Sequence, residues 1–308
     1  MNPLRSTILA ASRSRRVRHG VESFGATRRV VDRFVAGERT DDALECVHRL
    51  TSEGLLVTVD HLGEEVTDDA GAEATVDAYG SLLAALSEKD LARGADVSVK
   101  LSALGVVADE GRARERAGRI LASARAAGAT MTVDMEHSEL TSTTLAVVRS
   151  LRDEDPSVAA VLQAMLRRTE DDARRLADEG ARVRLCKGAY AEDATVAFQR
   201  RTEVDASYRR CLAILMGGSG TPLAATHDPA MLTAAIELAA AAGRDPGTYE
   251  LQLLLGVRPD EQRRLRSLGL TVRVYVPFGT EWWGYLMRRL AERPQNLAFF
   301  ARALASRR

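Results

Sequence analysis

The stretch GLLVTVD at residues 54–60 is short, apolar and rich in β-branched residues, and it ends in an aspartate. Seven runs of the same kind follow it along the chain. They are DVSVKL (96–101), ATMTVDM (129–135), AAVLQA (159–164), ARVRLC (181–186), PLAATH (222–227), YELQLL (249–254) and LTVRVYV (270–276). Runs of this length and composition are typical of buried strands. The sequence therefore predicts eight strands.

Longer segments rich in Ala, Leu and Arg separate these runs and predict helices, for example over 71–90, 110–127, 168–179 and 229–242. A glycine often stands just before the next strand, where a helix would end. Examples are Gly54, Gly94, Gly128 and Gly180. Eight strand–helix repeats predict an α/β protein with a parallel (βα)8 barrel of the TIM type.

An open, doubly wound sheet is the structural alternative. Such a sheet usually carries a glycine-rich phosphate-binding turn after its first strand. Here the first strand continues into Asp60-His61-Leu62-Gly63-Glu64, which contains no GxGxxG. We therefore favour the barrel. We expect one domain over residues 1–308, with a helical arm over 1–52 and the barrel with a C-terminal helix over 53–308.

Composition limits the classes of function. The chain has 308 residues, 45% of them hydrophobic and 28% charged, and no formal net charge, which argues against binding nucleic acid through its phosphates. Cys46, Cys186 and Cys211 are too few and too far apart for a disulfide framework or a zinc motif. No run is as long as the roughly 18–20 apolar residues of a membrane span. These features indicate a cytoplasmic protein.

The barrel predicts where chemistry lies, because barrel enzymes use the C-terminal ends of their strands. In this chain the expected ends are all polar or ionisable. They carry Asp60 and His61, Lys100 and Ser102, Asp134 and Glu136, Gln163, Arg184 and Lys187, Thr226 and His227, Gln252, and Tyr275. Lysine is scarce in this sequence, yet two of its three lysines stand there. We expect a functional site at this rim.

The segment YVPFGTEWWGYLMRRLAERPQN (275–296) predicts a helix after Pro277. On this helix Tyr285, Arg288, Arg289 and Glu292 share one face, because residues three and four apart are neighbours. Paired guanidiniums beside a phenol and a carboxylate suit a small anion such as a carboxylate. A solvated helix face with an Arg–Glu pair is the alternative.

The segment VRLCKGAY (183–190) is the second informative motif. Arg184 would favour the reduced form of a planar, electron-accepting ring, since reduction adds negative charge. Lys187 and the small residue Gly188 would suit a pyrophosphate close to the backbone. A strand-ending turn with a surface arginine is the simpler reading.

Two other kinds of site use the same rim. Asp60, His61, Asp134, Glu136, His137 and His227 could bind a metal, but the first strand lacks an HxH pair and no HExxH occurs. Lys100 or Lys187 could form a Schiff base, which requires a neutral lysine. Two lysines among carboxylates and an arginine pair suit fixed positive charges better.

Seven motifs in this order resemble those of the monofunctional bacterial proline dehydrogenases, a family of FAD-dependent (βα)8-barrel enzymes. They are VKLSALG (99–105), TVDMEHS (132–138), LQAML (162–166), RLCKGAY (184–190), ATHDP (225–229), LQLLLG (251–256) and YVPFG…YLMRRLAE (275–292). The resemblance covers residues 30 to 300. It implies oxidation of L-proline to Δ1-pyrroline-5-carboxylate by FAD bound without a Rossmann fingerprint, and no metal.

The resemblance also implies site residues. Asp134 and Arg184 would act in catalysis, with Arg184 near the flavin nitrogen that receives hydride. FAD would contact Met135, Gln163, Arg184, Lys187, Gly188, Ala189, Tyr190, Thr226 and His227. Proline would lie among Lys100, Leu254, Tyr275, Tyr285, Arg288 and Arg289, with Glu292 orienting the arginine pair. The sequence departs from the family at Asp228, where an asparagine is frequent, and at Leu255, where many relatives have an aromatic residue or histidine.

The family further implies a membrane quinone as electron acceptor, and a separate pyrroline-5-carboxylate dehydrogenase would act on the product. The segment Leu297-Ala298-Phe299-Phe300 before Arg302 could make a peripheral contact with the inner face of the membrane, and a packed C-terminal helix is the alternative. Two other functions remain open from the sequence. One is a flavin barrel enzyme that reduces a folate with a nicotinamide. The other is a barrel that binds an amino acid without catalysis.

Overall fold

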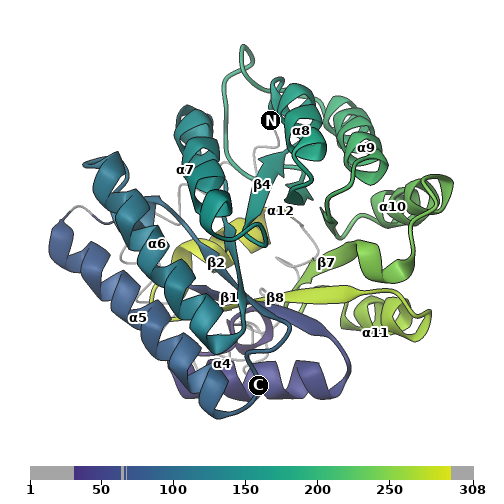
Figure 1. Ribbon diagram of the computed structural model, residues 1–308. Helices are drawn as coiled ribbons and strands as arrows, with labels where there is room; N and C mark the ends of the chain where they lie inside the picture. The colour runs from purple at the N-terminus through teal and green to yellow at the C-terminus, as the bar shows by residue number, and fades with distance from the viewer. Residues whose placement is uncertain (1–30, 64–65, 67, 293–308) are drawn as a thin grey trace, which may run out of the picture.

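Eight parallel strands close into a barrel (Figure 1). The computed structural model describes residues 31–63, 66 and 68–292, the last five of them by their backbone alone. In this part of the chain each strand pairs with the next, and β8 pairs with β1. The strands are β1 (Leu56–His61), β2 (Ala95–Val99), β3 (Thr130–Val133), β4 (Ala159–Gln163), β5 (Arg182–Cys186), β6 (Pro222–Ala225), β7 (Glu250–Leu254) and β8 (Val272–Phe278). The predicted (βα)8 barrel is confirmed.

One helix follows each strand, and those after β1 to β7 surround the ring (Figure 1). These are α5 (Asp69–Glu88), α6 (Glu110–Ala127), α7 (Thr141–Glu154), α8 (Thr169–Asp178), α9 (Arg201–Gly217), α10 (Pro229–Ala241) and α11 (Pro259–Ser267). The glycines predicted to end helices all adopt positive φ, between 63° and 81°, a conformation that glycine adopts without steric cost. None of the helices in the described residues is long and apolar enough to span a membrane.

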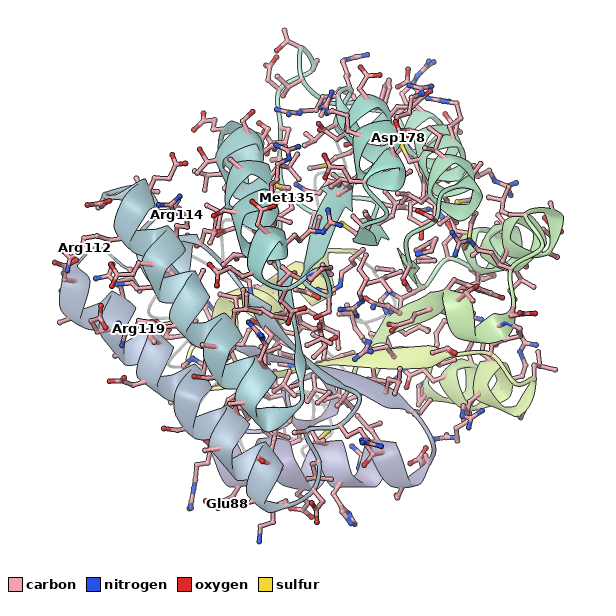
Figure 2. The ribbon with its side chains drawn as sticks, viewed as in Figure 1. Glu88, Arg112, Arg114, Arg119, Met135 and Asp178 are labelled. Carbon is pink, nitrogen blue, oxygen red and sulfur yellow. The ribbon has the colours of Figure 1, made fainter. Side chains whose placement is uncertain are left out.

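The outer faces of the helices carry the surface charge. Glu88, Arg112 and Arg119 project away from the barrel (Figure 2). Two of these side chains also connect neighbouring helices, because Arg112 on α6 pairs with Asp69 on α5 and Arg119 pairs with Glu73. Exposed pairs of this kind contribute little to stability, at most about 1 kcal/mol each.

Two further helices depart from the simple repeat. Helix α4 (Thr40–Ser52) precedes the barrel and packs against β8, β1 and α5. Helix α12 (Trp282–Glu292) follows β8, and its buried Trp282 and Leu286 belong to an apolar cluster with Leu62 and Val257. Leu62 directly follows β1 and Val257 lies three residues after the end of β7, so α12 lies at the C-terminal end of the barrel.

The leading helices expected before residue 31 lie outside the described residues. The division of the chain at residue 52 stays a prediction.

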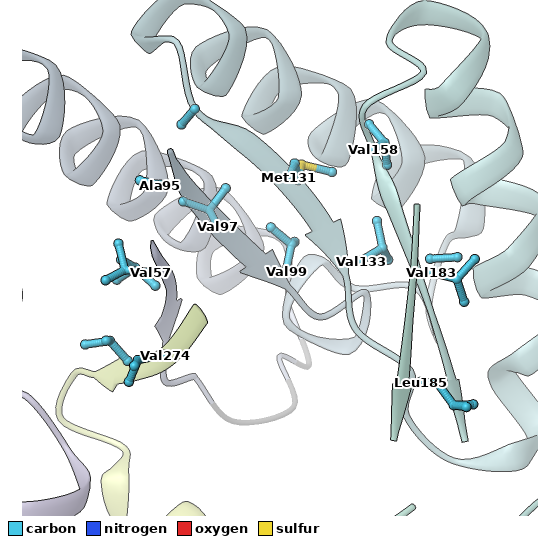
Figure 3. Close-up of a cluster of buried hydrophobic side chains, with 14 of the residues drawn as sticks. Val57, Ala95, Val97, Val99, Met131, Val133, Val158, Val183, Leu185 and Val274 are labelled. Atoms are coloured by element: carbon cyan, nitrogen blue, oxygen red, sulfur yellow. The ribbon is translucent and has the colours of Figure 1, made fainter. Parts of the chain in front are cut away.

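An apolar layer fills the space between the strands and the surrounding helices. Alternate strand residues such as Val57, Val97, Val99, Met131 and Val274 are fully buried there (Figure 3). The side chains between them point into the barrel, because successive strand residues face opposite sides. Many of these inward residues are polar, among them Thr58, Asp96, Ser98, Thr132 and Arg184. The barrel therefore has an apolar exterior and a largely polar interior.

The end of the eighth strand differs from the prediction. Strand β8 continues to Phe278, two residues beyond the expected 270–276. Although Pro277 lacks a donor, its carbonyl oxygen accepts a 2.9 Å hydrogen bond from the Ala36 amide, and the Phe278 carbonyl accepts one from Leu62 at 2.7 Å. The pairing with β1 therefore extends past the proline, and Tyr275 lies within the strand and not at its end.

Replacement of Val97 by alanine tests the apolar layer. Val97 is fully buried, whereas Val107 is 76% exposed, so Val107→Ala is a matched control. We expect Val97→Ala to lower the free energy of unfolding by about 1.5–3 kcal/mol and Val107→Ala to change it by less than about 0.5 kcal/mol. Urea denaturation followed by circular dichroism measures both. Equal effects would contradict the assigned burial.

Candidate active site

Asp134 lies at the centre of the predicted site. It directly follows β3, and its Oδ1 accepts a 2.9 Å hydrogen bond from Arg184 Nη1. Its Oδ2 accepts one of 2.9 Å from the Tyr275 hydroxyl and lies 3.6 Å from Lys100 Nζ. Three predicted site residues, Lys100, Arg184 and Tyr275, therefore meet around the carboxylate of a fourth.

Lys100 is held as a cation. Its Nζ donates a 2.7 Å hydrogen bond to Asp60, whose side chain is 1% exposed. Burial alone would lower the pKa of Lys100, but attraction to Asp60 and Asp134 outweighs burial and raises this pKa above its ordinary value. A Schiff-base lysine must be neutral to attack a carbonyl carbon. The surroundings of Lys100 therefore favour a fixed positive charge.

Arg184 is buried, and five protein groups surround its guanidinium. Nε donates to Gln252 Oε1 at 2.8 Å, Nη1 to Ser98 Oγ and Asp134 Oδ1 at 2.9 Å each, and Nη2 to Thr58 Oγ1 and Asp96 Oδ2 at 3.3 Å each. Its five N–H groups thus all have acceptors. A hydrogen bond to a cofactor would share or replace one of these bonds.

Tyr275 lies between Arg184 and Asp134. The centre of its ring is 5.4 Å from the carbon of the Arg184 guanidinium, within the range of a cation–π contact. Burial and the nearby carboxylates of Asp134 and Asp60 raise the pKa of Tyr275 well above its ordinary value. Tyr275 therefore remains a neutral phenol that donates its proton to Asp134.

A second cationic group stands at the end of β5. Lys187 donates to Asp205 and, at 2.8 Å, to Asp228, which also accepts a 2.9 Å bond from Arg201. Burial alone would raise the pKa of Asp228, but the bonds from Lys187 and Arg201 outweigh it and lower this pKa to about 2. Asp228 is therefore ionised at neutral pH.

The turn after Lys187 requires glycine for two reasons. Gly188 has φ of +106°, and a Cβ added there would lie 2.4 Å from the sulfur of Met165. The space beside Gly188 is thus filled by the chain's own side chain. The Tyr190 ring, two residues on, contacts the His137 ring in a tilted arrangement, with ring centres 4.2 Å apart.

The other residues predicted at the cofactor site lie along neighbouring strand ends. Gln163 is buried at the end of β4 and donates to the Glu136 carbonyl at 2.8 Å. Thr226 and His227 follow β6, and His227 Nε2 accepts a 2.8 Å hydrogen bond from the Leu254 amide. His227 therefore connects the expected cofactor side to Leu254 on the expected substrate side. Met135 is buried after β3 and Ala189 half-buried after β5.

Helix α12 brings further predicted residues to this end of the barrel. Tyr285 is buried in the apolar cluster against which Leu254 packs. Arg288, Arg289 and Glu292 lie on the same helix, but their side chains lie outside the described part of the structure. Their predicted roles stay predictions.

His61, predicted at the rim, faces away from the site. His61 lies between Tyr79 and Phe278, with ring centres 6.1 and 5.2 Å away, and burial lowers its pKa. Asp60 points into the barrel, so its neighbour His61 must point outwards. Across the described residues no group of three or more His, Cys, Asp or Glu side chains is arranged to hold a metal ion.

Two carboxylates hold the cations of the site: Asp60 was expected at the rim but not as the partner of Lys100, and Asp96 was not predicted. Asp60 binds Lys100, and the fully buried Asp96 binds Arg184 from the side opposite Asp134. Their signal in the sequence is a polar residue at every second position of a strand, as in Thr58-x-Asp60 and Asp96-x-Ser98-x-Lys100. This period of two indicates one polar face.

Comparison with known proteins decides the family. The protein-family model described as "Proline dehydrogenase" matches residues 43–302. The chain belongs to the proline dehydrogenase family. Proline dehydrogenase 1 of Bacillus subtilis (strain 168) is 33% identical over 302 residues, which are 98% of this chain and 99% of that relative. The proline dehydrogenase of Deinococcus radiodurans is 34% identical over 280 residues, or 89% and 90% of the two chains.

A solved structure of similar fold supports the same architecture. Proline utilization A from Bdellovibrio bacteriovorus, inactivated by N-propargylglycine, superposes with a TM-score of 0.79 at 24% identity. The match covers 86% of this proline dehydrogenase family member and 32% of the larger chain. Membership of the family makes this chain an oxidoreductase of proline catabolism, an activity that requires a redox cofactor.

Asp228→Asn tests the cationic pair at the end of β5. Asp228 also accepts a hydrogen bond from the Ala230 amide at the start of α10, and asparagine caps helices as well as aspartate does. The pKa near 2, against an ordinary value of 3.8, means that Asp228 stabilises the fold by roughly 2 kcal/mol above pH ~4, and that this contribution disappears as pH falls towards 2.

We therefore expect Asp228→Asn to be less stable than the wild type at pH 7, with a difference that shrinks below about pH 4. Urea denaturation between pH 3 and 7 measures it. A difference independent of pH would contradict a contribution from the ion pair, since asparagine preserves the cap.

Proposed function

We propose that this chain oxidises L-proline to Δ1-pyrroline-5-carboxylate with FAD as its cofactor. The observation that carries the proposal is the convergence of Lys100, Asp134, Arg184 and Tyr275 at the C-terminal end of the barrel, beneath α12. A cation held beside a neutral phenol suits a small carboxylate substrate. The match to the proline dehydrogenase family supports the same substrate.

The residues of β3 to β6 fit FAD in chemical kind. Gln163, Arg184, Lys187 and Thr226 offer an amide, a guanidinium, an ammonium and a hydroxyl on three consecutive strands, and Met135 adds an apolar surface. Cations suit the anionic pyrophosphate and a ring that gains negative charge, while an apolar side chain suits the ring face. When bound, FAD supplies the acceptor for the hydride from the ring carbon next to nitrogen.

The substrate carboxylate would lie between opposed cations. Lys100 stays protonated through Asp60 and Asp134. Arg288 and Arg289, on α12, would approach from the other side with the planar donor forks that suit carboxylates. Cations on two sides of the carboxylate would fix the orientation of the small, rigid proline ring. The ring would then meet the cofactor in one defined geometry and not by random encounter. Leu254 and Tyr285 would form its apolar wall.

The substrate must also lose a proton from nitrogen, because an ammonium has no lone pair to form the new C=N bond. Cations around the site disfavour the ammonium form of the substrate and so promote this loss. Asp134 orders Lys100, Arg184 and Tyr275 through its two oxygens. We assign Asp134 this ordering role in catalysis.

Electrons would then pass to a membrane quinone, through peripheral contact at the inner face of the membrane. Water would open the imine product to an aldehyde, which a separate dehydrogenase would oxidise to glutamate.

The visible spectrum of the purified protein tests this function. We expect a flavin spectrum that bleaches when L-proline is added without oxygen and that D-proline leaves unchanged. Bleaching by a nicotinamide instead of proline would indicate the folate-reductase alternative. Flavin that no amino acid bleaches would contradict proline oxidation, and a protein that binds no FAD after reconstitution would contradict the cofactor.

Arg288→Lys tests the carboxylate clamp. Lysine keeps the charge but loses the bidentate geometry, so we expect KM for proline to rise by roughly 10- to 100-fold while FAD content stays unchanged. The matched control is Arg263→Lys on the exposed face of α11. Steady-state kinetics with an artificial acceptor measure both variants. An unchanged KM in Arg288→Lys would remove Arg288 from the clamp.

A further inference from the structure

Eight charged side chains of alternating sign form one continuous row through the barrel. From the C-terminal end they are Asp60, Lys100, Asp134, Arg184, Asp96, Arg182, Glu250 and Arg273. Successive closest N···O distances are 2.7, 3.6, 2.9, 3.3, 3.7, 4.0 and 2.7 Å. We call this row the axial ion row. Its upper half forms the active site, whereas its lower half, from Asp96 onwards, has no role in the reaction described above.

Asp96 joins the two halves of the axial ion row. It is fully buried, and its oxygens accept hydrogen bonds from Thr58, Thr130 and Thr132 at 3.1, 2.7 and 2.7 Å. Oδ2 also accepts the bond from Arg184, and Oδ1 faces Arg182. Three hydroxyls on the two neighbouring strands thus fix the Asp96 carboxylate in one orientation. In this orientation the carboxylate accepts the hydrogen bond from Arg184.

The charge that Arg184 presents to the active site depends on both of its carboxylates. Asp134 lies at the mouth, and Asp96 lies below. Charges in the protein interior are screened much less than in water, so a carboxylate within hydrogen-bond distance offsets much of the guanidinium's field. Arg182 in turn offsets Asp96, because it approaches the other oxygen of the same carboxylate.

We propose that Asp96 is a positioning residue that orients Arg184, sets its effective charge and thereby sets the reduction potential of the bound flavin. This inference rests on the proposed use of FAD. The reduced ring carries more negative charge than the oxidised ring, so a stronger positive field at Arg184 stabilises the reduced form. The negative charge of Asp96 therefore lowers the reduction potential of the flavin. The positive charge of Arg182 raises it, although Arg182 touches neither substrate nor cofactor.

Two substitutions of opposite charge test the proposal. Asp96→Asn keeps the shape of the side chain but removes its negative charge, and we expect the midpoint potential of the bound flavin to rise. Arg182→Met removes a positive charge, and we expect the potential to fall. For each variant we expect the ratio of reduced to oxidised flavin to change on the order of tenfold, which is about 30 mV for a two-electron couple. Anaerobic spectroelectrochemical titration of the purified holoenzymes measures the potentials.

Asp172→Asn is the matched control. Asp172 is 1% exposed and pairs with Arg168 and Arg175, but it lies on α8, outside the ring of strands. The control should lose stability without a shift in potential. Opposite shifts in Asp96→Asn and Arg182→Met, with no shift in the control, would support the proposal, since general structural damage has no reason to change sign with charge.

Shifts in the same direction, or no shift in either variant, would overturn the proposal while leaving FAD and proline oxidation intact. If Asp96→Asn does not fold, the direction of the shift in Arg182→Met decides alone, and an unchanged or raised potential overturns the proposal. A wild-type protein without flavin would overturn both this inference and the proposed function.

Discussion

Every ion buried inside the barrel must find a partner of opposite sign, and this constraint organises the site. Transfer of a charge from water to the protein interior costs several kcal/mol unless an opposite charge and hydrogen bonds compensate. In the axial ion row each member faces at least one partner on another strand, and Gln252 joins Arg184 to Glu250 as a neutral bridge. A slip of one residue in any strand would turn its ions towards the apolar layer. The register of the strands and the geometry of the site therefore depend on each other.

The barrel interior can be polar because the apolar layer between the strands and the helices stabilises the fold. Bulky branched residues such as valine, isoleucine and leucine usually fill the inside of a TIM-type barrel. Here the apolar layer between strands and helices contains the large cluster of buried hydrophobic residues, including Leu82, Leu83, Ile120 and Leu121 on the helices. Burial of that layer drives folding. The barrel interior can then carry charges that serve chemistry.

The sequence predicted the elements more completely than the site. Apolar β-branched runs located all eight strands, and glycines such as Gly128 and Gly180 marked helix ends, because these signals are local. The extension of β8 past Pro277 depends on hydrogen bonds from Ala36 and Leu62, which are distant in sequence. The site residues came from motif resemblance and from their places at strand ends. Asp96 was not predicted as a site residue, because it is the first residue of its predicted strand and its position alone does not show that it faces inwards.

The partners of Arg184 show why local sequence signals cannot predict the whole site. They also show how the fold holds the guanidinium of Arg184 in place. Thr58, Ser98, Asp134 and Gln252 lie 126, 86, 50 and 68 residues away in the sequence. Only closure of the ring brings them together. A guanidinium held by five acceptors cannot turn as charge moves nearby, so its field is in place before reaction and needs no reorganisation. The same rigidity makes its field adjustable only through the charges that hold it, and one of them, Asp96, is fully buried in the barrel interior.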